Sequence, residues 1–184
     1  CEGQQFDMDF EKLPEVSIAD YLQMIELKTA VLLAASFEIG AICAGAEKTD
    51  AEKLYEFGKQ VGIAFQLQDD ILDVYGDADK FGKKVGGDIV ANKKTYLLVR
   101  AFELANKYQK EELQHWSLAS EKDAAAKIDG VKTIYDQLGV RKSAEEEMHR
   151  HYKAGIKALE NVKADETKKK VLKDFTDGLM VREH

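Results

Sequence analysis

Proline is almost absent from this sequence. The chain has one proline in 184 residues, whereas average usage is roughly 5%. Sandwiches and barrels need many turns, and turns recruit proline, so the composition excludes most all-β architectures. With 45% hydrophobic and 33% charged residues, the chain is expected to fold. We therefore predict an all-α protein in which residues 1–184 form a single all-helical domain.

Cysteine, positive charge and long apolar runs are also scarce. Two cysteines, Cys1 and Cys43, do not make a disulfide scaffold, and reduced thiols favour a cytoplasmic protein. The formal net charge is −7, and the absence of a long basic stripe argues against nucleic acid as a partner. The stretch that could be mistaken for a membrane span, residues 30–46, is shorter than the required length of about 20 apolar residues and contains Glu38. We expect a buried helix there and no membrane span.

Hydrophobic periodicity and capping residues predict a series of helices. Ser17, followed by Asp20, is a plausible N-cap of a helix that ends near Gly45. A second helix is expected from about residue 51 to 75, followed by a long glycine-rich, charged loop that begins at Gly76. Further helices are expected at about 93–107, 109–118, 121–138, 141–163 and 165–181.

An acidic stripe occupies the last turns of the helix expected at 51–75. At about 100° per residue, one narrow face collects Gly62, Gln66, Asp69, Asp70 and Asp73. Apolar residues flank this face on both sides, unlike the wide polar arc of a surface helix. Carboxylates on adjacent turns repel each other by about 3 kcal/mol per pair at ~6 Å and an effective dielectric of ~20, so a cation would stabilise them. Oxygen ligands without histidine or cysteine suit Mg²⁺. The alternative is a solvated acidic face.

This stretch resembles the second aspartate-rich motif of the trans-isoprenyl diphosphate synthases, the farnesyl, geranylgeranyl and polyprenyl family. The family pattern is Phe-Gln-x-x-Asp-Asp-x-x-Asp, and it is matched by Phe65, Gln66, Asp69, Asp70 and Asp73. A Gly/Lys loop at 81–95 resembles a third family element. Two further stretches resemble family elements. The family's opening Gly-Gln-x-x-Asp is matched by Gly3, Gln4 and Asp7, and its Lys-Thr helix is matched by Tyr21, Met24, Lys28 and Thr29.

The resemblance implies an isoprenoid synthase-type helical bundle and a Mg²⁺-dependent prenyltransferase. The enzyme would condense an allylic diphosphate with isopentenyl diphosphate and release pyrophosphate, and members of this family are usually homodimers. The implied metal ligands are Asp69, Asp70 and Asp73. The implied catalytic side chains are Lys28, Thr29 and Gln66. The residues that would bind diphosphate are Lys28, Lys83, Lys84 and Lys93. The allylic pocket would include Gln4, Asp7, Gly62 and Phe65.

Simpler structural interpretations stay open for several of these residues. Thr29 could bond to its own backbone, and Lys28 could extend from an apolar helix toward solvent. Gly62 could leave room for a hydrocarbon chain or could permit close contact between two helices. The loop lysines could form an exposed basic loop.

One element of the family pattern is missing from this sequence. The first aspartate-rich motif, with the arginines that follow it, does not occur. The chain also opens abruptly, with what looks like the end of a helix at residues 4–10. These observations predict that the chain is the C-terminal part of a longer enzyme and is inactive alone.

Two other functions were considered. A noncatalytic partner subunit is the first alternative, against which the intact motif residues argue. A di-iron carboxylate bundle is the second, because Glu-x-x-His pairs occur at Glu112/His115 and Glu146/His149. Both pairs lie in polar segments, whereas di-iron ligands project into a bundle core, so we expect surface histidines instead.

Overall fold

The structure is a computed structural model that describes residues 1–77 and 85–180. These residues form helices joined by turns, with no strand among them, which confirms the predicted all-α class. The first helices are α1 (Glu2–Phe10), α2 (Ile18–Ile25), the π-helix η1 (Glu26–Ala30), α3 (Val31–Cys43) and α4 (Lys48–Tyr75). They are followed by α6 (Gly87–Val90), α7 (Tyr96–Leu104), α8 (Lys107–Ser117), the 3₁₀ helix η2 (Glu121–Asp123), α9 (Ala124–Leu138), α10 (Val140–Glu160) and α11 (Glu166–Met180).

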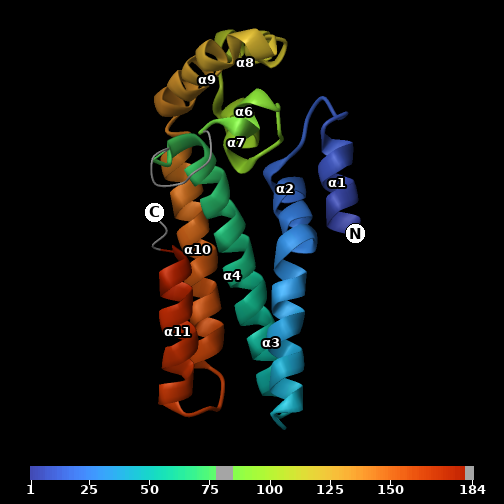
Figure 1. The fold of residues 1–184 in the computed structure, drawn as a ribbon, viewed down its shortest axis with the longest axis vertical. Coiled ribbons are helices and arrows are strands. Elements are labelled where there is room, and N and C mark those ends of the chain that lie inside the picture. The colour runs from blue at the N-terminus through green and yellow to red at the C-terminus, as the bar shows by residue number, and fades with distance from the viewer. Residues whose placement is uncertain (78–84, 181–184) are drawn as a thin grey trace.

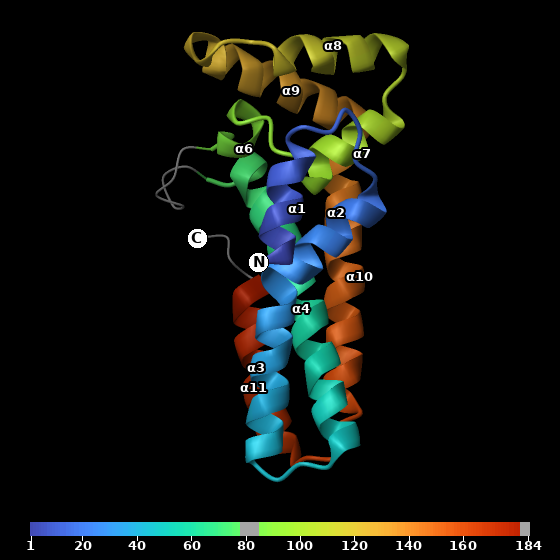
Figure 2. The same cartoon turned by 90° about the vertical axis from the view of Figure 1, so that its right-hand side faces the viewer.

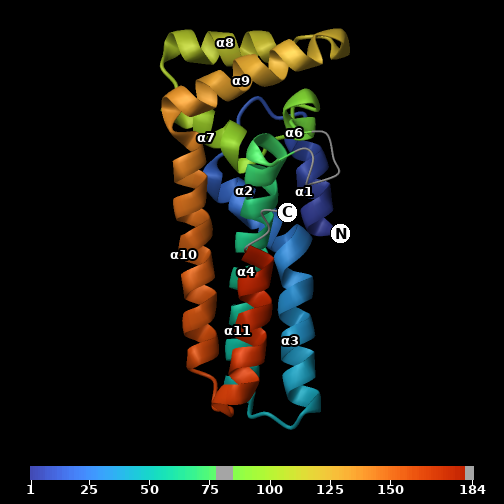
Figure 3. The same cartoon turned by 60° about the vertical axis from the view of Figure 1, so that its left-hand side comes forward.

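Long helices aligned with the long axis of the molecule form its main body. The helix α4 packs most extensively against α10 and α3 (Figure 1). The helix α11 contacts both α4 and α10 and lies over α4 in Figure 3. The helices α8 and α9 cross one end of the bundle (Figure 2), and α7 lies beneath them. The C-terminal end of α4 therefore meets α2, α6 and α7 at this end.

The helix expected from Ser17 to Gly45 is continuous but contains a π-helical turn. Ser17 caps α2 with a capping box, in which its side chain and that of Asp20 each bond to the other's backbone N–H. At η1 the hydrogen bond from the N–H of Val31 to the carbonyl of Glu26 spans five residues instead of four. Single π-turns inside α-helices are frequently found at functional sites. The prediction of a regular α-helix was therefore wrong at this turn. The expectation of a buried helix at residues 30–46 was also wrong, because Leu32, Ile39 and Ile42 are exposed.

Small residues bring α3 and α4 into close contact. A β-carbon on Gly62 would lie 2.7 Å from the Cα of Ala30, and one on Gly58 would lie 2.8 Å from the Cα of Ala34. Real β-carbons essentially never approach other atoms so closely, so these positions require glycine. Gly58 thus brings the backbone of α4 against α3, and Gly62 brings it against Ala30, the last residue of η1.

Several element boundaries differ from those expected, and the helix expected at 93–107 spans Tyr96–Leu104. The helix α4 begins at Lys48, and Asp50 within its first turn is buried, accepting hydrogen bonds from Lys53 and from the N–H of Lys163. The segment after Gly76 includes a short helix, α6, which begins after Gly86 at a positive φ of 85°.

Across the described part of the chain, no helix combines the length and the apolar character needed to cross a bilayer.

Candidate functional site

Asp70 is deeply enclosed near the end of α4, with 4% of its surface exposed. Its Oδ2 accepts hydrogen bonds from the Tyr21 hydroxyl at 2.5 Å and from the backbone N–H of Tyr96 at 3.0 Å. Its Oδ1 accepts a longer one, of 3.3 Å, from Nε2 of Gln66. Burial raises the pKa of Asp70 to about 7, although these hydrogen bonds favour the carboxylate. Asp70 thus joins α2, α4 and the start of α7 at one buried point.

Asp73 follows on α4 and holds the start of α6. Its Oδ2 accepts a hydrogen bond from the N–H of Asp88 at 3.0 Å, and its backbone oxygen accepts one from the N–H of Gly86 at 2.5 Å. Burial raises the pKa of the half-buried Asp73 carboxyl. The side chain of Asp88 in turn pairs with Lys93, with 2.7 Å between Oδ1 and Nζ, and this hydrogen bond raises the pKa of Lys93. Asp73 therefore has an anchored cation beside it.

Lys28 and Thr29 lie in η1, and each contacts a residue of another helix. The Nζ of Lys28 is 2.6 Å from Oδ2 of Asp7 on α1. The Oγ1 of Thr29 donates a hydrogen bond of 3.1 Å to Oε1 of Gln66 on α4. The hydroxyl of Thr29 is therefore directed across the helix interface and does not bond to its own backbone. Both predicted catalytic residues of η1 are brought to the motif end of α4.

The helix α1 approaches η1 closely because Gly3 has no side chain. A β-carbon on Gly3 would lie 2.2 Å from the backbone nitrogen of Lys28. This approach places Asp7 where it pairs with Lys28 and where its charge also contributes to the raised pKa of Lys93. One carboxylate of α1 thus lies near two of the lysines predicted to bind diphosphate.

These contacts gather carboxylates and ammonium groups around one end of a helical bundle. Each of the two described lysines already has a carboxylate partner, so neither is an isolated charge. Behind them lies an apolar cluster that includes Met24, Ile63 and Leu67. An arrangement of this kind can hold a polyanion through lysines and through a divalent cation, beside walls that exclude water.

The carboxylates fit Mg²⁺ only as a partial ligand set. Within residues 1–77 and 85–180, no three His, Cys, Asp or Glu side chains are grouped so that they could hold a metal ion. The two oxygens of Asp70 already accept hydrogen bonds from three donors. Mg²⁺ commonly takes one or two protein carboxylates and completes its shell with water and substrate phosphate. The oxygen-only donor set is therefore compatible with Mg²⁺, and the half-buried Asp73 is less enclosed than Asp70.

Gly62 packs closely against Ala30, and its place in an allylic pocket stays a prediction. The space beside it is filled by Ala30, so the alternative interpretation, close helix contact, is the one the structure supports. Gln4 is exposed on α1 and Phe65 is half-buried one turn before Asp69. The predicted diphosphate ligands Lys83 and Lys84 lie outside the described residues.

The Glu-x-x-His pairs are surface features. Glu112 and His115 are exposed on α8, where the imidazole contacts Trp116 edge to face. Glu146 and His149 are exposed on α10, where Nδ1 of His149 lies 2.6 Å from the carbonyl oxygen of Glu145. None of the four projects into the bundle, so the di-iron interpretation is not supported.

Tyr21 and Asp88 were not among the predicted site residues, although both contact them directly. Tyr21 was noted only as part of the Lys-Thr helix pattern, yet its hydroxyl binds Asp70. Asp88 belongs to the Gly/Lys loop, yet it links Asp73 to Lys93. For Asp88, a signal was present in the sequence, because an acidic residue five positions before Lys93 in a glycine-rich loop is a natural partner for that lysine.

Known proteins resemble this chain along its whole length. The short chain isoprenyl diphosphate synthase of Methanothermobacter thermautotrophicus is 34% identical over 184 residues, which cover 100% of this chain and 55% of that protein. The geranylfarnesyl diphosphate synthase of Natronomonas pharaonis is 33% identical over 184 residues, covering 100% of this chain and 52% of that protein. The chain thus spans about half the length of these relatives.

A solved structure has the same fold. A crystal structure of geranylgeranyl pyrophosphate synthase superposes with a TM-score of 0.91 and 40% sequence identity, covering 100% of this chain and 57% of that one. The family model described as polyprenyl synthetase matches residues 1–138. The chain belongs to the polyprenyl synthetase family.

Proposed function

We propose that the protein containing this chain is a Mg²⁺-dependent prenyltransferase. It joins an allylic diphosphate to isopentenyl diphosphate and releases pyrophosphate. The observation that supports this proposal is that Asp73, at the end of α4, is linked through Asp88 to Lys93, while Lys28 pairs with Asp7, beside an apolar cluster. The relatives are named as short-chain isoprenyl, geranylfarnesyl and geranylgeranyl diphosphate synthases, which supports the substrate class.

In this proposal the lysines bind the diphosphate of the allylic substrate. Lys28 and Lys93 are held in place by Asp7 and Asp88, respectively, and an incoming diphosphate shares these cations. Asp69 and Asp73 would hold Mg²⁺, which when bound supplies charge neutralisation on the leaving pyrophosphate. Asp70 acts as a positioning residue because it fixes Tyr21 and the start of α7 against α4.

The side chains around the reacting carbons have a second task. Loss of pyrophosphate leaves an allylic cation, which water would quench, so the site must exclude solvent. The oxygens of Thr29 and Gln66, which face each other at 3.1 Å, can stabilise that cation without attacking it. Phe65 contributes to the apolar wall one turn before Asp69.

We further propose that the active protein is a cytoplasmic homodimer and that this chain alone is inactive. Two free, exposed cysteines support a reducing compartment. The span of about half of each relative supports the expectation that the remaining half supplies further metal ligands.

The test is prenyl transfer from labelled isopentenyl diphosphate by the whole protein with Mg²⁺. Asp69→Asn is expected to lower kcat by about 10² to 10³-fold, the size seen when one group stabilising a transition-state charge is removed. The control Asp174→Asn, on exposed α11, should leave kcat unchanged, and this chain alone should show no transfer. Unchanged transfer by Asp69→Asn would overturn the metal-site proposal. A whole protein that transfers only after a second, different subunit is added would favour the partner-subunit alternative.

A further inference from the structure

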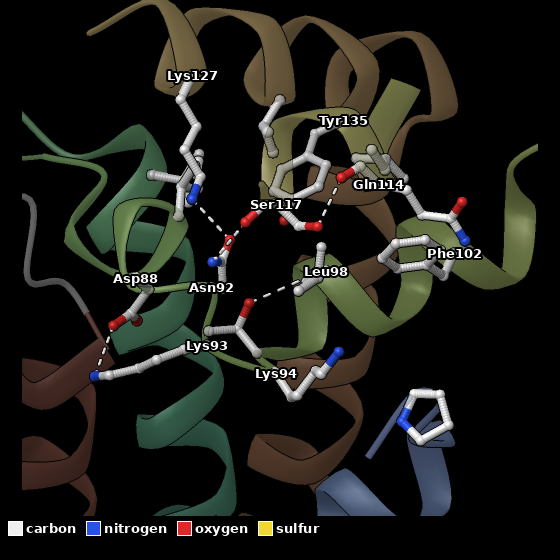
Figure 4. A pocket seen from close by; sticks show the side chains of 16 residues that line it. Asp88, Asn92, Lys93, Lys94, Leu98, Phe102, Gln114, Ser117, Lys127 and Tyr135 are labelled. Carbon is white, nitrogen blue, oxygen red and sulfur yellow. Dashed lines mark hydrogen bonds and ion pairs between the residues drawn. The ribbon is translucent and has the colours of Figure 1, made fainter. Parts of the chain in front are cut away.

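Two adjoining cavities lie between the segment before α7, α7 itself and the crossing helices α8 and α9. The first has a volume of about 150 Å³ and the second about 210 Å³, and they share Lys94, Leu98 and Phe102 in their walls. Figure 4 shows the first cavity. It adjoins the candidate site at Asp88 and Lys93, which belong to both.

The lining of the first cavity is positively charged, although the chain has a net charge of −7. Among the described residues that line this cavity, Asp88 is the one acidic residue, and its side chain is paired with Lys93. Lys94 and Lys127 contribute two further amines. The Lys94 side chain has no ion pair or hydrogen bond within residues 1–77 and 85–180. The cavity therefore has positive charge that no carboxylate of its own wall neutralises.

Lys127 is a buried amine with neutral partners. It is 3% exposed, and its Nζ donates to the carbonyl oxygen of Val90 at 3.1 Å and to Oδ1 of Asn92 at 2.7 Å. Figure 4 shows it reaching from α9 toward Asn92. Burial lowers the pKa of Lys127. A lysine ammonium has three donors, and a buried charge is strongly stabilised by an opposite charge. The wall thus provides an anchored cation that favours an anionic ligand.

The rest of the wall is mixed, because the uncharged polar residues Asn92, Thr95, Gln114 and Ser117 line it beside an apolar part. Leu98, Phe102, Val131 and the ring of Tyr135 line the cavity. Its volume corresponds to about five water-sized groups. A bare inorganic anion would leave these apolar side chains against water, whereas a ligand with a small hydrocarbon body would cover them.

We propose that this cavity binds a small amphipathic anion. A compact body of about five carbons packs against Leu98, Phe102 and Val131. A carboxylate or phosphate head faces Lys94, while the buried Lys127 adds positive charge from the opposite side of the cavity (Figure 4). The binding requires neither a metal ion nor the prenyl-transfer reaction, so it is independent of the proposed function.

The experiment is isothermal titration calorimetry on the whole protein with EDTA present, which removes divalent metal from the candidate site. The probes are cyclopentyl phosphate, cyclopentanecarboxylate, cyclopentanol and inorganic phosphate. At least one of the two ring anions is expected to bind, about tenfold or more tightly than cyclopentanol or inorganic phosphate, because a hydrogen bond to a charged group contributes about 1.5 to 3 kcal/mol. The stronger of the two anions identifies the head group.

Variants then place the binding in this cavity. Lys94→Ala, at the half-exposed mouth, should weaken binding about tenfold, and Val131→Phe should abolish it by filling the interior. Lys157→Ala removes an exposed lysine near the far end of α10 and should leave the affinity unchanged. Asp69→Asn should also leave it unchanged, whatever its effect on prenyl transfer. If Val131→Phe fails to fold, Lys94→Ala alone decides the location.

Three results would overturn the proposal. The first is the absence of heat for both ring anions at millimolar concentration. The second is equal affinity for cyclopentanol, which would show that the lysines do not select an anion. The third is binding that Lys94→Ala leaves intact, or that Asp69→Asn removes, which would place the anion elsewhere. None of these results bears on prenyl transfer, so the two proposals fail separately.

Discussion

The two halves of α4 hold their neighbours by different means. The first half, which includes Gly58, meets α3 through glycine–alanine contacts in which backbones nearly touch. The second half, from Gln66 to Asp73, meets α2, η1, α6 and α7 through hydrogen bonds to side chains and backbone groups. One helix thus combines close glycine–alanine packing against α3 with a buried cluster of hydrogen bonds near its C-terminal end.

The difference shows how close backbone packing can hold the polar groups of a helix in fixed positions. Close packing at Gly62 fixes the position of η1 relative to α4, because Ala30 is the last residue of η1. Thr29, its immediate neighbour, can then reach Gln66. Placement of the polar groups therefore depends on the apolar contact beside them. Substitutions in each half should separate the two contributions.

Gly62→Ala is expected to have the largest effect. The added carbon would lie 2.7 Å from the Cα of Ala30, and relief requires separation of η1 from α4. We expect the free energy of unfolding to fall by about 3 kcal/mol or more, the upper range for overpacking. Urea denaturation measures this change. The matched control is Gly178→Ala on α11, where nothing lies within 4 Å, and it should be neutral or stabilising by up to about 1 kcal/mol. Equal effects at the two positions would contradict the account of this contact.

Tyr21→Phe should have the next largest effect, through the polar half. The substitution removes the hydroxyl that donates to Asp70 at 2.5 Å and leaves a buried carboxylate with one donor fewer. We expect destabilisation of about 1 to 3 kcal/mol, measured by urea denaturation. Tyr108→Phe, at a tyrosine that is 75% exposed, is the control and should change stability little. A neutral Tyr21→Phe would mean that Asp70 does not depend on this bond.

Thr29→Val should destabilise the protein less, by about 1 kcal/mol, because one partly buried hydrogen bond is lost. Thr29→Ser keeps the hydroxyl and should restore most of the bond. Thermal unfolding of the two variants gives the comparison. If Thr29→Val is as stable as the native protein while Thr29→Ser is less stable, the methyl group of Thr29 matters and its bond to Gln66 does not.

The smallest effect is expected at His151, which packs between α10 and α4, with Nδ1 at 2.6 Å from Oε1 of Gln60. Burial and the charge of Arg150 lower its pKa below the usual 6.5, against the opposing charge of Glu147; Lys59 also faces it. As the pH falls below 6.5, this imidazole therefore takes up a proton in the unfolded chain before it does so in the folded protein. The free energy of unfolding decreases over this pH range. His151→Gln should lack this part of the decrease and should match the pH dependence of the native protein above pH 7. Equal slopes below 6.5 would show that His151 titrates normally.

The sequence predicted the fold class and the acidic face for reasons that are local. Proline scarcity, hydrophobic periodicity and the spacing of Asp69, Asp70 and Asp73 depend on one helix at a time. The role of Gly62 and the partners of Asp70 depend on which helices are neighbours. A stripe calculated from α4 alone could not show that Ala30 fills the space at Gly62 or that Tyr21 and Tyr96 approach Asp70.

The π-turn was missed for a different reason. Glu26 to Ala30 has the composition of an ordinary helical segment, and five-residue hydrogen bonding leaves no simple mark in a hydrophobic pattern. The Lys-Thr pair drew attention to this segment through chemistry and not through geometry. The sequence therefore predicted where Lys28 and Thr29 lie along the helix, but it did not predict the direction in which their side chains point.

The extra residue in this turn sets the rotational phase between α2 and α3. Deleting one residue from Glu26–Ala30 would let the turn rewind as regular α-helix, at the cost of rotating everything before it by about 100° relative to everything after it. Tyr21 would then lose its hydrogen bond to Asp70, while Ala34 would stay in contact with Gly58. The π-turn therefore sets the relative rotation of two helix faces, one that carries Tyr21 and one that packs against α4.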